Sequence, residues 1–140
     1  MDEQINIEKI KNANTKVLGK NIIYYPEISS TQDVAKEKAH LQLANGTIFL
    51  TDKQTNGKGT QGRSWYSSKG ENLTFTILLY PTCKISQLEH LTIDVANGIK
   101  RAIQKYLGVE LTIKKPNDLL LSHKKISGIL TQMGTQNGKI

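Results

Sequence analysis

The sequence predicts an α+β domain, in which strands and helices are mixed along one chain. Segments rich in β-branched and aromatic residues alternate with two segments whose apolar residues recur at helical spacing. Towards the carboxyl end, short strand-like segments follow one another closely, as in an antiparallel ribbon. The sequence has no internal repeats or low-complexity tracts, and a chain of 140 residues suits a single domain with one core.

Two strands and a helix are predicted in the first third of the chain. Ser30 and Asp33 have the spacing of a capping box, with Asp in place of the usual Glu, so a helix should begin there. Asn45 and Gly46 are typical of its end. The expected elements are a strand over residues 21–28, a helix over 29–43 and a strand over 47–53.

A second helix is predicted by a capping box at Ser86 and Glu89 and by Gly108 in the usual closing position. Between these signals, apolar residues recur at steps of three and four. They are Leu88, Leu91, Val95, Ile99, Ala102 and Tyr106.

The remaining strands are predicted by alternating or continuous apolar runs. Two of them should form an antiparallel ribbon through a tight connection at His123 and Lys124. Asn137 and Gly138 are a strong hairpin signal with only two residues after it, so we expect a fragment that lacks part of the native sheet. The strands are expected over residues 72–81, 109–113, 119–122 and 125–133.

The charge of the chain favours an anionic partner. Lysine and arginine number 19 against 12 acidic residues, which gives a net charge of +7. The single cysteine, Cys83, can form no intramolecular disulfide, and the amino-terminal residues lack the apolar core of a signal peptide. No apolar run approaches the ~18 residues of a membrane span. We therefore expect a cytoplasmic protein that does not enter the membrane.

The segment KQTNGKGTQGRSW, residues 53–65, is a glycine-rich loop between two predicted strands. Gly57, Gly59 and Gly62 match the dinucleotide fingerprint, but that motif requires a helix after the third glycine, and here a strand follows. A P-loop requires Ser or Thr directly after Gly-Lys, and glycine stands there instead. Both nucleotide motifs are therefore excluded.

Two interpretations of this loop remain. Its glycines allow backbone N–H groups to form an anion-binding concavity, to which Lys58 and Arg63 would add charge. Alternatively, it is a surface hairpin whose cations are solvated. Two later segments bear on the choice: a Pro-Asn-Asp turn at residues 116–118, and KKISGIL, in which Lys125 opens an apolar strand and Gly128 interrupts it.

Four motifs in this order resemble the catalytic domain of biotin protein ligases. They are SSTQ at residues 29–32, the loop at 53–65, KKPNDLLL at 114–121 and KKISGIL at 124–130, and the resemblance covers residues 24–133. It implies a mixed, largely antiparallel sheet with helices, like that of class II aminoacyl-tRNA synthetases. On this basis, residues 1–20 are a linker-like segment and 21–140 are a catalytic domain that is incomplete at its carboxyl end.

The resemblance implies a two-step ligase reaction with biotin, ATP and Mg²⁺. The carboxylate of biotin attacks the α-phosphate of ATP, and the biotinyl-adenylate then transfers biotin to a lysine on the carrier domain of a carboxylase. The resemblance also admits a homodimer. It implies DNA binding only where a winged helix-turn-helix precedes the catalytic domain, and residues 1–20 are too short for one.

The resemblance also assigns site residues. Lys125 would bridge the carboxylate and the reacting phosphate, and Arg63 and Asp118 complete the catalytic set; no residue is assigned directly to a metal. The expected biotin-binding residues are Ser30, Thr31, Gln32, Gln54, Lys58, Gly59, Thr60, Lys125 and Gly128. The expected nucleotide-binding residues are Gly57, Lys58, Arg63, Trp65, Lys114, Asn117 and Asp118.

The sequence departs from the family pattern at two positions. Thr60 stands where the family has an arginine that retains the adenylate, and Lys115 replaces a tryptophan. Three alternatives to a biotin ligase stay open: a lipoate or octanoyl ligase of the same fold, a basic nucleic-acid-binding module, and an inactive fragment. His40, His90 and His123 lack the spacing of metal ligands and are interpreted as surface residues.

Overall fold

The computed structural model describes residues 5–134. Within this range the chain forms two compact units, residues 5–81 (unit 1) and 82–134 (unit 2). The length of the chain alone predicts one core, and it gives no sign of this division into two units. The hairpin signal at Asn137 and Gly138 lies outside the described residues.

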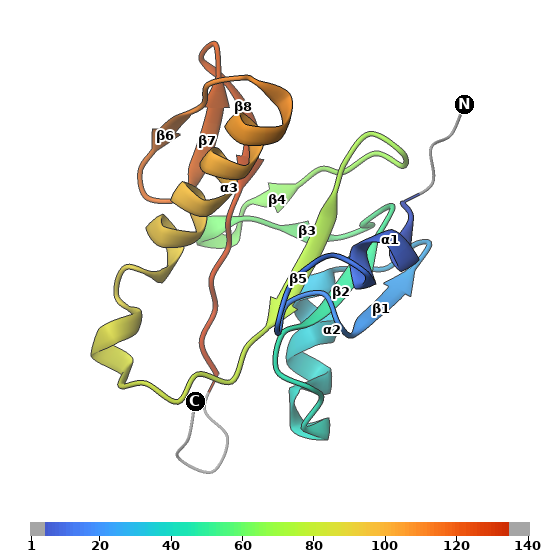
Figure 1. The fold of residues 1–140 in the computed structure, drawn as a ribbon. Helices are drawn as coiled ribbons and strands as arrows, with labels where there is room; N and C mark the ends of the chain where they lie inside the picture. The colour runs from blue at the N-terminus through green and yellow to red at the C-terminus, as the bar shows by residue number, and fades with distance from the viewer. Residues whose placement is uncertain (1–4, 135–140) are drawn as a thin grey trace. The chain divides into compact units, whose positions relative to one another are not determined.

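Unit 1 is built on a three-stranded sheet in the order β1-β2-β5 (Figure 1). The strands are β1 (Ile22–Tyr25), β2 (Thr47–Thr51) and β5 (Thr74–Leu78). β1 and β2 are parallel, and β2 and β5 are antiparallel. The central strand β2 carries the buried side chains of Phe49 and Leu50. The predicted strands are present, each shorter than expected.

The helix α2 (Thr31–Lys38) packs on β2 and β5 and begins at the predicted cap. The Ser30 hydroxyl accepts a hydrogen bond from the Asp33 backbone N–H at 3.4 Å. The predicted end at Asn45 and Gly46 is wrong. A 3₁₀ turn, η1 (Ala39–Leu41), follows α2, and Gln42 stops it with a left-handed φ of 50°. Asn45 instead accepts a hydrogen bond from the Tyr80 N–H.

The amino-terminal segment of unit 1 contains a short helix, α1 (Ile7–Lys11). The Lys20 ammonium donates to the carbonyl oxygen of Lys11, the last residue of α1, at 3.2 Å and to that of Ala13, just beyond the helix, at 3.0 Å. Val17 lies against Gly46, where a Cβ atom would be 2.8 Å from a Val17 methyl group. The segment predicted to be linker-like is thus ordered from residue 5 onwards.

The glycine-rich loop of unit 1 contains two very short strands, β3 (Gly57–Lys58) and β4 (Ser64–Trp65), which pair antiparallel. A 3₁₀ turn, η2 (Thr60–Gly62), connects them. Arg63 and β4 follow Gly62, and no helix begins there, which agrees with the exclusion of the dinucleotide motif.

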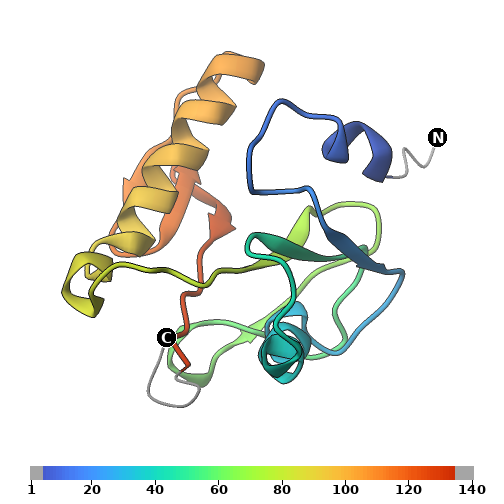
Figure 2. The same cartoon turned by 60° about the horizontal axis from the view of Figure 1, so that its bottom comes forward.

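Unit 2 consists of a long helix, α3 (Leu91–Leu107), on a three-stranded sheet (Figure 2). The capping box predicted at Ser86 and Glu89 is wrong. A 3₁₀ turn, η3 (Ile85–Leu88), occupies this stretch, and the Gln87 side chain accepts from the Lys84 N–H at 3.0 Å. The C-cap prediction is confirmed, because Gly108 ends α3 with φ 68°.

The sheet of unit 2 is antiparallel throughout, in the order β6-β7-β8. The predicted connection is displaced by one residue: Ser122 and His123 form the turn, both with positive φ as a tight hairpin requires, and Lys124 already belongs to a strand. Ala96, Leu111 and Leu119 are the buried centre of this unit. The strands are β6 (Thr112–Lys114), β7 (Asp118–Leu121) and β8 (Lys124–Gly128).

Both units together have the predicted mixture of helices with largely antiparallel strands, since only β1 and β2 run parallel. No helix among residues 5–134 is long and apolar enough to cross a membrane.

Candidate functional site

The glycine-rich loop is an ordered ribbon, and Gly57 is the residue that permits it. A Cβ atom on Gly57 would overlap the carbonyl oxygen of Trp65 and lie 2.7 Å from Gln54 Nε2. Gly59 is different, because its Cβ would make only an ordinary contact of 3.5 Å with the Arg63 carbonyl oxygen. The close approach made possible by Gly57 is thus to the protein's own backbone.

The base of the loop is fastened to the segment that leads into α2. Residues Ile28 and Gln54 form a parallel β-bridge. Next to it, the N–H groups of Thr55 and Asn56 donate to the carbonyl oxygens of Ile28 and Ser29 at 2.9 and 2.8 Å. These bonds bring the SSTQ segment and the loop side by side.

A cluster of neutral polar side chains fills the junction between loop and helix. Gln54 Oε1 accepts hydrogen bonds from the Thr31 backbone N–H at 2.9 Å and from the Thr31 hydroxyl at 3.2 Å. The backbone N–H of Gln54 donates to the Ser67 hydroxyl at 3.0 Å. Thr31 and Ser67 are both 3% exposed, so these bonds satisfy groups that water cannot reach.

The strand β5 contributes to the same cluster through Thr76. Its hydroxyl lies 2.9 Å from the Thr31 hydroxyl and 3.2 Å from Gln32 Oε1. We refer to Thr31, Gln32, Gln54, Ser67 and Thr76 as the polar cluster. Sequence reasoning missed Ser67 and Thr76. The Thr76 signal was present in the alternation of β5, which places two threonines on one face, whereas nothing in the sequence singles out Ser67.

Lys58 is held by a carboxylate that the sequence analysis did not assign to the site. Its ammonium lies 2.7 Å from Asp33 Oδ2 and 2.8 Å from Oδ1. Asp33 belongs to the first turn of α2, where a negative charge is also favoured by the helix dipole. The pair is about two-fifths exposed and leaves Lys58 partly neutralised.

The tip of the loop carries the other predicted loop residues. Arg63 is exposed, and its guanidinium donates to Gln61 Oε1 at 2.9 Å. Its carbonyl oxygen accepts from the Gly59 N–H at 2.7 Å, which closes the ribbon across Thr60. Trp65 is half-buried at the end of β4.

A groove of about 640 Å³ runs along one side of the loop. Gln54, Gly57 and Trp65 of the predicted site line it, together with the ion pair between Lys53 and Glu27 at 2.7 Å. The hydrogen bond and charge of Glu27 raise the pKa of Lys53, so this lysine stays protonated at neutral pH. The groove therefore has both polar and charged walls.

Unit 2 brings two predicted catalytic residues into direct contact. Lys125 Nζ lies 2.7 Å from Asp118 Oδ1. Lys125 is opposite Leu120 in the sheet and Asp118 is two residues along the same strand, so the lysine side chain reaches its partner diagonally. Asp118 Oδ1 is buried and makes no well-aligned hydrogen bond within residues 5–134, so the ion pair is what compensates its charge.

The other predicted residues of unit 2 surround this pair. Gly128 is directly opposite Asp118 on one side and Lys114 is opposite it on the other. Asn117 has a structural role, because its side-chain N–H₂ donates to the Ile129 carbonyl oxygen at 3.1 Å and its own carbonyl accepts from the Ile129 N–H at 2.9 Å. These bonds fix the chain as it leaves β8.

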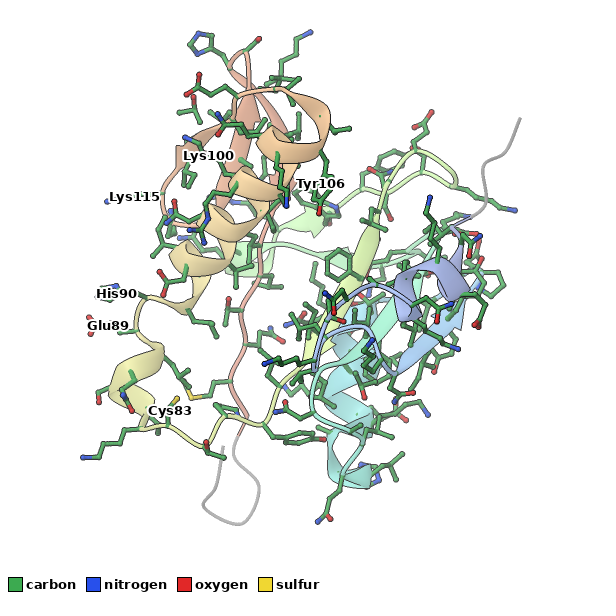
Figure 3. The ribbon with its side chains drawn as sticks, viewed as in Figure 1. Cys83, Glu89, His90, Lys100, Tyr106 and Lys115 are labelled. Atoms are coloured by element: carbon green, nitrogen blue, oxygen red, sulfur yellow. The ribbon has the colours of Figure 1, made fainter. Side chains whose placement is uncertain are left out.

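The histidines and Lys115 belong neither to the polar cluster nor to the residues around Lys125 and Asp118. His40, His90 and His123 are exposed, as predicted. Residues 5–134 contain no group of three or more His, Cys, Asp or Glu side chains that could hold a metal ion. Figure 3 shows Glu89 and His90 near the start of α3, and Lys115 also lines their shallow groove of about 290 Å³. The structure gives no reason for lysine in place of tryptophan at position 115.

Comparison with known proteins gives one consistent family. Residues 24–139 match the model described as "Biotin/lipoate A/B protein ligase family". The bifunctional ligase/repressor BirA of Bacillus subtilis is 35% identical over 126 residues, which are 90% of this chain and 39% of that protein. The chain thus spans about two-fifths of this relative's length.

Solved structures agree with the sequence match. A biotin protein ligase from Aquifex aeolicus in complex with biotin and ATP is 32% identical, with a TM-score of 0.70 over 81% of this chain and 47% of that one. The Leishmania major enzyme in complex with biotinyl-5-AMP is 29% identical, with a TM-score of 0.70 over 79% and 51%. The predicted fold class is therefore confirmed, and the chain corresponds to about half of these ligases.

Proposed function

The chain belongs to the biotin/lipoate A/B protein ligase family, and from this premise we propose that it activates biotin with ATP and transfers it to a lysine of a carboxylase carrier domain. The proposal is supported by the similar solved structures, which are biotin protein ligases in complex with biotin and ATP or with biotinyl-5-AMP. It is also supported by residues of both units, each considered by itself below.

The observation that carries the proposal is the polar cluster of unit 1. Residues assigned to biotin from two separate motifs, Thr31 and Gln54, are joined there by hydrogen bonds at 2.9 and 3.2 Å. The ureido ring of biotin has two N–H donors and one carbonyl acceptor. Hydroxyl and carboxamide groups supply both kinds of partner, so the cluster suits that ring.

In the proposed first step, a carboxylate oxygen of biotin attacks the α-phosphorus of ATP. The bond from this phosphorus to the oxygen of the β-phosphate breaks, and pyrophosphate leaves with the bonding electrons. Two anions must approach each other, so a fixed cation lowers the barrier. We assign this role to Lys125, which the 2.7 Å contact with Asp118 holds in place.

In the proposed second step, the acceptor lysine amine attacks the carbonyl carbon of biotinyl-AMP. AMP leaves, the amine loses a proton, and an amide forms. Thr60 affects how long the biotinyl-adenylate stays bound between the two steps, because threonine offers no bidentate contact to the adenylate phosphate. We therefore expect the intermediate to be released more readily than it would be with arginine at position 60.

We propose that magnesium binds together with ATP and not at a separate protein site. Mg²⁺ in such sites is usually held by the substrate phosphates, waters and one or two carboxylates. Asp118 is the carboxylate of the predicted set that would contribute. The ion would neutralise part of the phosphate charge. The acceptor, a homodimer and a cytoplasmic location likewise remain proposals.

The test is biotin-dependent exchange of labelled pyrophosphate into ATP by the 140-residue chain. Exchange with biotin, and none with lipoate, octanoate or no acid, is the expected result. Exchange with lipoate or octanoate alone would move the function to the other branch of the family. No exchange with any acid would contradict the activity of this chain, and restored exchange in a longer version would assign the loss to missing residues.

A nucleic-acid-binding module is the alternative favoured by the net charge of +7. Binding of that kind weakens steeply with salt because counterions are released. Salt-insensitive binding of biotin, with no retention of DNA at physiological salt, would exclude this alternative.

A further inference from the structure

We propose that Thr76 is a positioning residue that gives the site its preference for a ureido ligand over a fatty acyl acid. The proposal rests on the proposed function for its ligand. Thr76 lies on β5, outside all four motifs, and its hydroxyl is within hydrogen-bond distance of two residues in the first turn of α2.

The direction of the hydrogen bonds in the polar cluster follows from its donors. The Thr31 backbone N–H can only donate, so the group of Gln54 that faces it at 2.9 Å must be the carbonyl oxygen, Oε1. The Thr31 hydroxyl has one hydrogen, and it donates to the same oxygen at 3.2 Å. The Thr31 hydroxyl oxygen is therefore an acceptor for Thr76, 2.9 Å away.

Thr76 thus lies within hydrogen-bond distance of two polar side chains and reaches a third, Gln54, through Thr31. It donates its single hydrogen to Thr31 or to Gln32 Oε1, which lie 2.9 and 3.2 Å away. Through Thr31 it also keeps the Gln54 carbonyl oriented towards α2 and the Gln54 amide nitrogen beside Gly57. Without this hydroxyl, Thr31 would lose a donor, and the orientation of both glutamine side chains would be less defined.

Ligand preference follows from this order. The hydrogen bonds of the cluster leave the Gln54 amide N–H₂ for a ligand, and an analogue that lacks a matching acceptor would leave this donor unpaired. Biotin has a ureido ring that can form hydrogen bonds with the cluster, whereas octanoate, which also has a carboxylate, has a hydrocarbon chain in place of this ring. Loosening the cluster should therefore weaken biotin binding and leave octanoate binding unchanged or stronger.

The test compares Thr76→Val with Thr76→Ser and Thr74→Val in the full chain. Valine removes the hydroxyl and keeps the shape, and serine restores the hydroxyl. Thr74 is on the same face of β5, and its side chain makes no hydrogen bond to another side chain within residues 5–134. The fluorescence of Trp65, the single tryptophan, reports binding of biotin and of octanoate.

We expect Thr76→Val to weaken biotin binding about 3- to 10-fold, the scale of one neutral hydrogen bond, with no loss for octanoate. Thr76→Ser and Thr74→Val should match the parent chain. Equal losses for both ligands would indicate a merely structural role and overturn the proposal, as would unchanged biotin affinity.

A second measurement needs no ligand. Hydrogen exchange of the Thr31 amide, which is bonded to Gln54, should become about 3- to 10-fold faster in Thr76→Val than in Thr74→Val. An unchanged exchange rate would contradict the positioning role. If the parent chain binds no biotin, the proposed function fails in this chain, and the exchange rates still decide whether Thr76 orders the cluster.

Discussion

The two units differ in what holds their most buried candidate site residues. In unit 1, neutral groups form a connected set of hydrogen bonds around Thr31 and Gln54, while Lys58 and Asp33 form a separate ion pair that is about two-fifths exposed. In unit 2, one ion pair between Lys125 and Asp118 is the central feature. Hydrogen bonds between neutral groups are directional, whereas an ion pair is less so and acts over a longer range. For the proposed reaction, we therefore expect unit 1 to recognise the ligand and unit 2 to stabilise charge.

The comparison also predicts how each unit responds to substitution. Removing one member of a hydrogen-bonded cluster should have a modest effect that depends on the ligand. Removing the cation from the pair should have a large effect on a reaction between anions, and it also leaves Asp118 Oδ1 buried without its partner.

The largest expected effect is that of Lys125→Met in unit 2. We expect the rate of biotin-dependent pyrophosphate exchange to fall about 10²- to 10³-fold, the usual scale for removing one preorganised donor. Lys124→Met is the matched control, because Lys124 is the preceding residue on β8 and is also exposed. Equal rates for the two variants would refute the assignment of Lys125.

The next effect concerns the backbone on which the unit 1 cluster depends. Gly57→Ala should lower the free energy of unfolding by about 1–3 kcal/mol, because the new methyl group would overlap the Trp65 carbonyl and force the ribbon apart. Gly59→Ala, whose Cβ meets only ordinary contacts, is the control. Urea unfolding followed by tryptophan fluorescence measures both. Similar stabilities would show that the loop accommodates a side chain at position 57.

Ser30→Ala separates helix capping from ligand recognition within unit 1. The Ser30 hydroxyl caps α2, so its loss should lower the free energy of unfolding by about 0.5–2 kcal/mol. The exposed neighbour Ser29 provides the control, Ser29→Ala. If thermal unfolding of Ser30→Ala is unaltered while biotin binding is lost, the cap is unimportant and the hydroxyl serves the ligand alone.

The smallest effect is at the edge of unit 1, where Tyr24 donates to Asp52 Oδ2 at 2.5 Å. This hydrogen bond raises the pKa of Tyr24 above its usual value of 10.0. The contribution of this hydrogen bond to stability is therefore complete below about pH 10, and it is lost as the pH rises through the higher pKa that Tyr24 has in the folded protein. Absorbance titration should show one of the five tyrosines ionising late, and Tyr24→Phe should remove that step.

Much of the fold could be predicted because its signals are local. The Ser30 cap, the Gly108 cap and the strand segments each depend on neighbouring residues. The predicted start of the second helix is wrong because Lys84 and Gln87, and not Ser86 and Glu89, form the hydrogen-bonded turn before it. Two equally spaced polar pairs overlap there, and only the packed chain selects one.

The sequence could name candidate site residues, but it could not give their contacts. Carry-over of family motifs named Lys58, Asp118 and Lys125, but it did not predict that Lys58 pairs with Asp33 or that Asp118 pairs with Lys125. Thr76 meets Thr31 across 45 positions of sequence. Such contacts arise from the pairing of β5 with β2 and the packing of α2, which no single motif encodes.

The closure of the glycine-rich loop has a consequence for how this protein can evolve. The ribbon is secured at Gly57 and by the bond between Gly59 and Arg63, and the turn at residues 60–62 connects these last two residues. Thr60 belongs to that turn. Under the proposed function, a change there alters the group nearest the adenylate without disturbing the fastened base. We therefore expect the lifetime of the intermediate to vary between lineages as a nearly independent trait, at little risk to the fold.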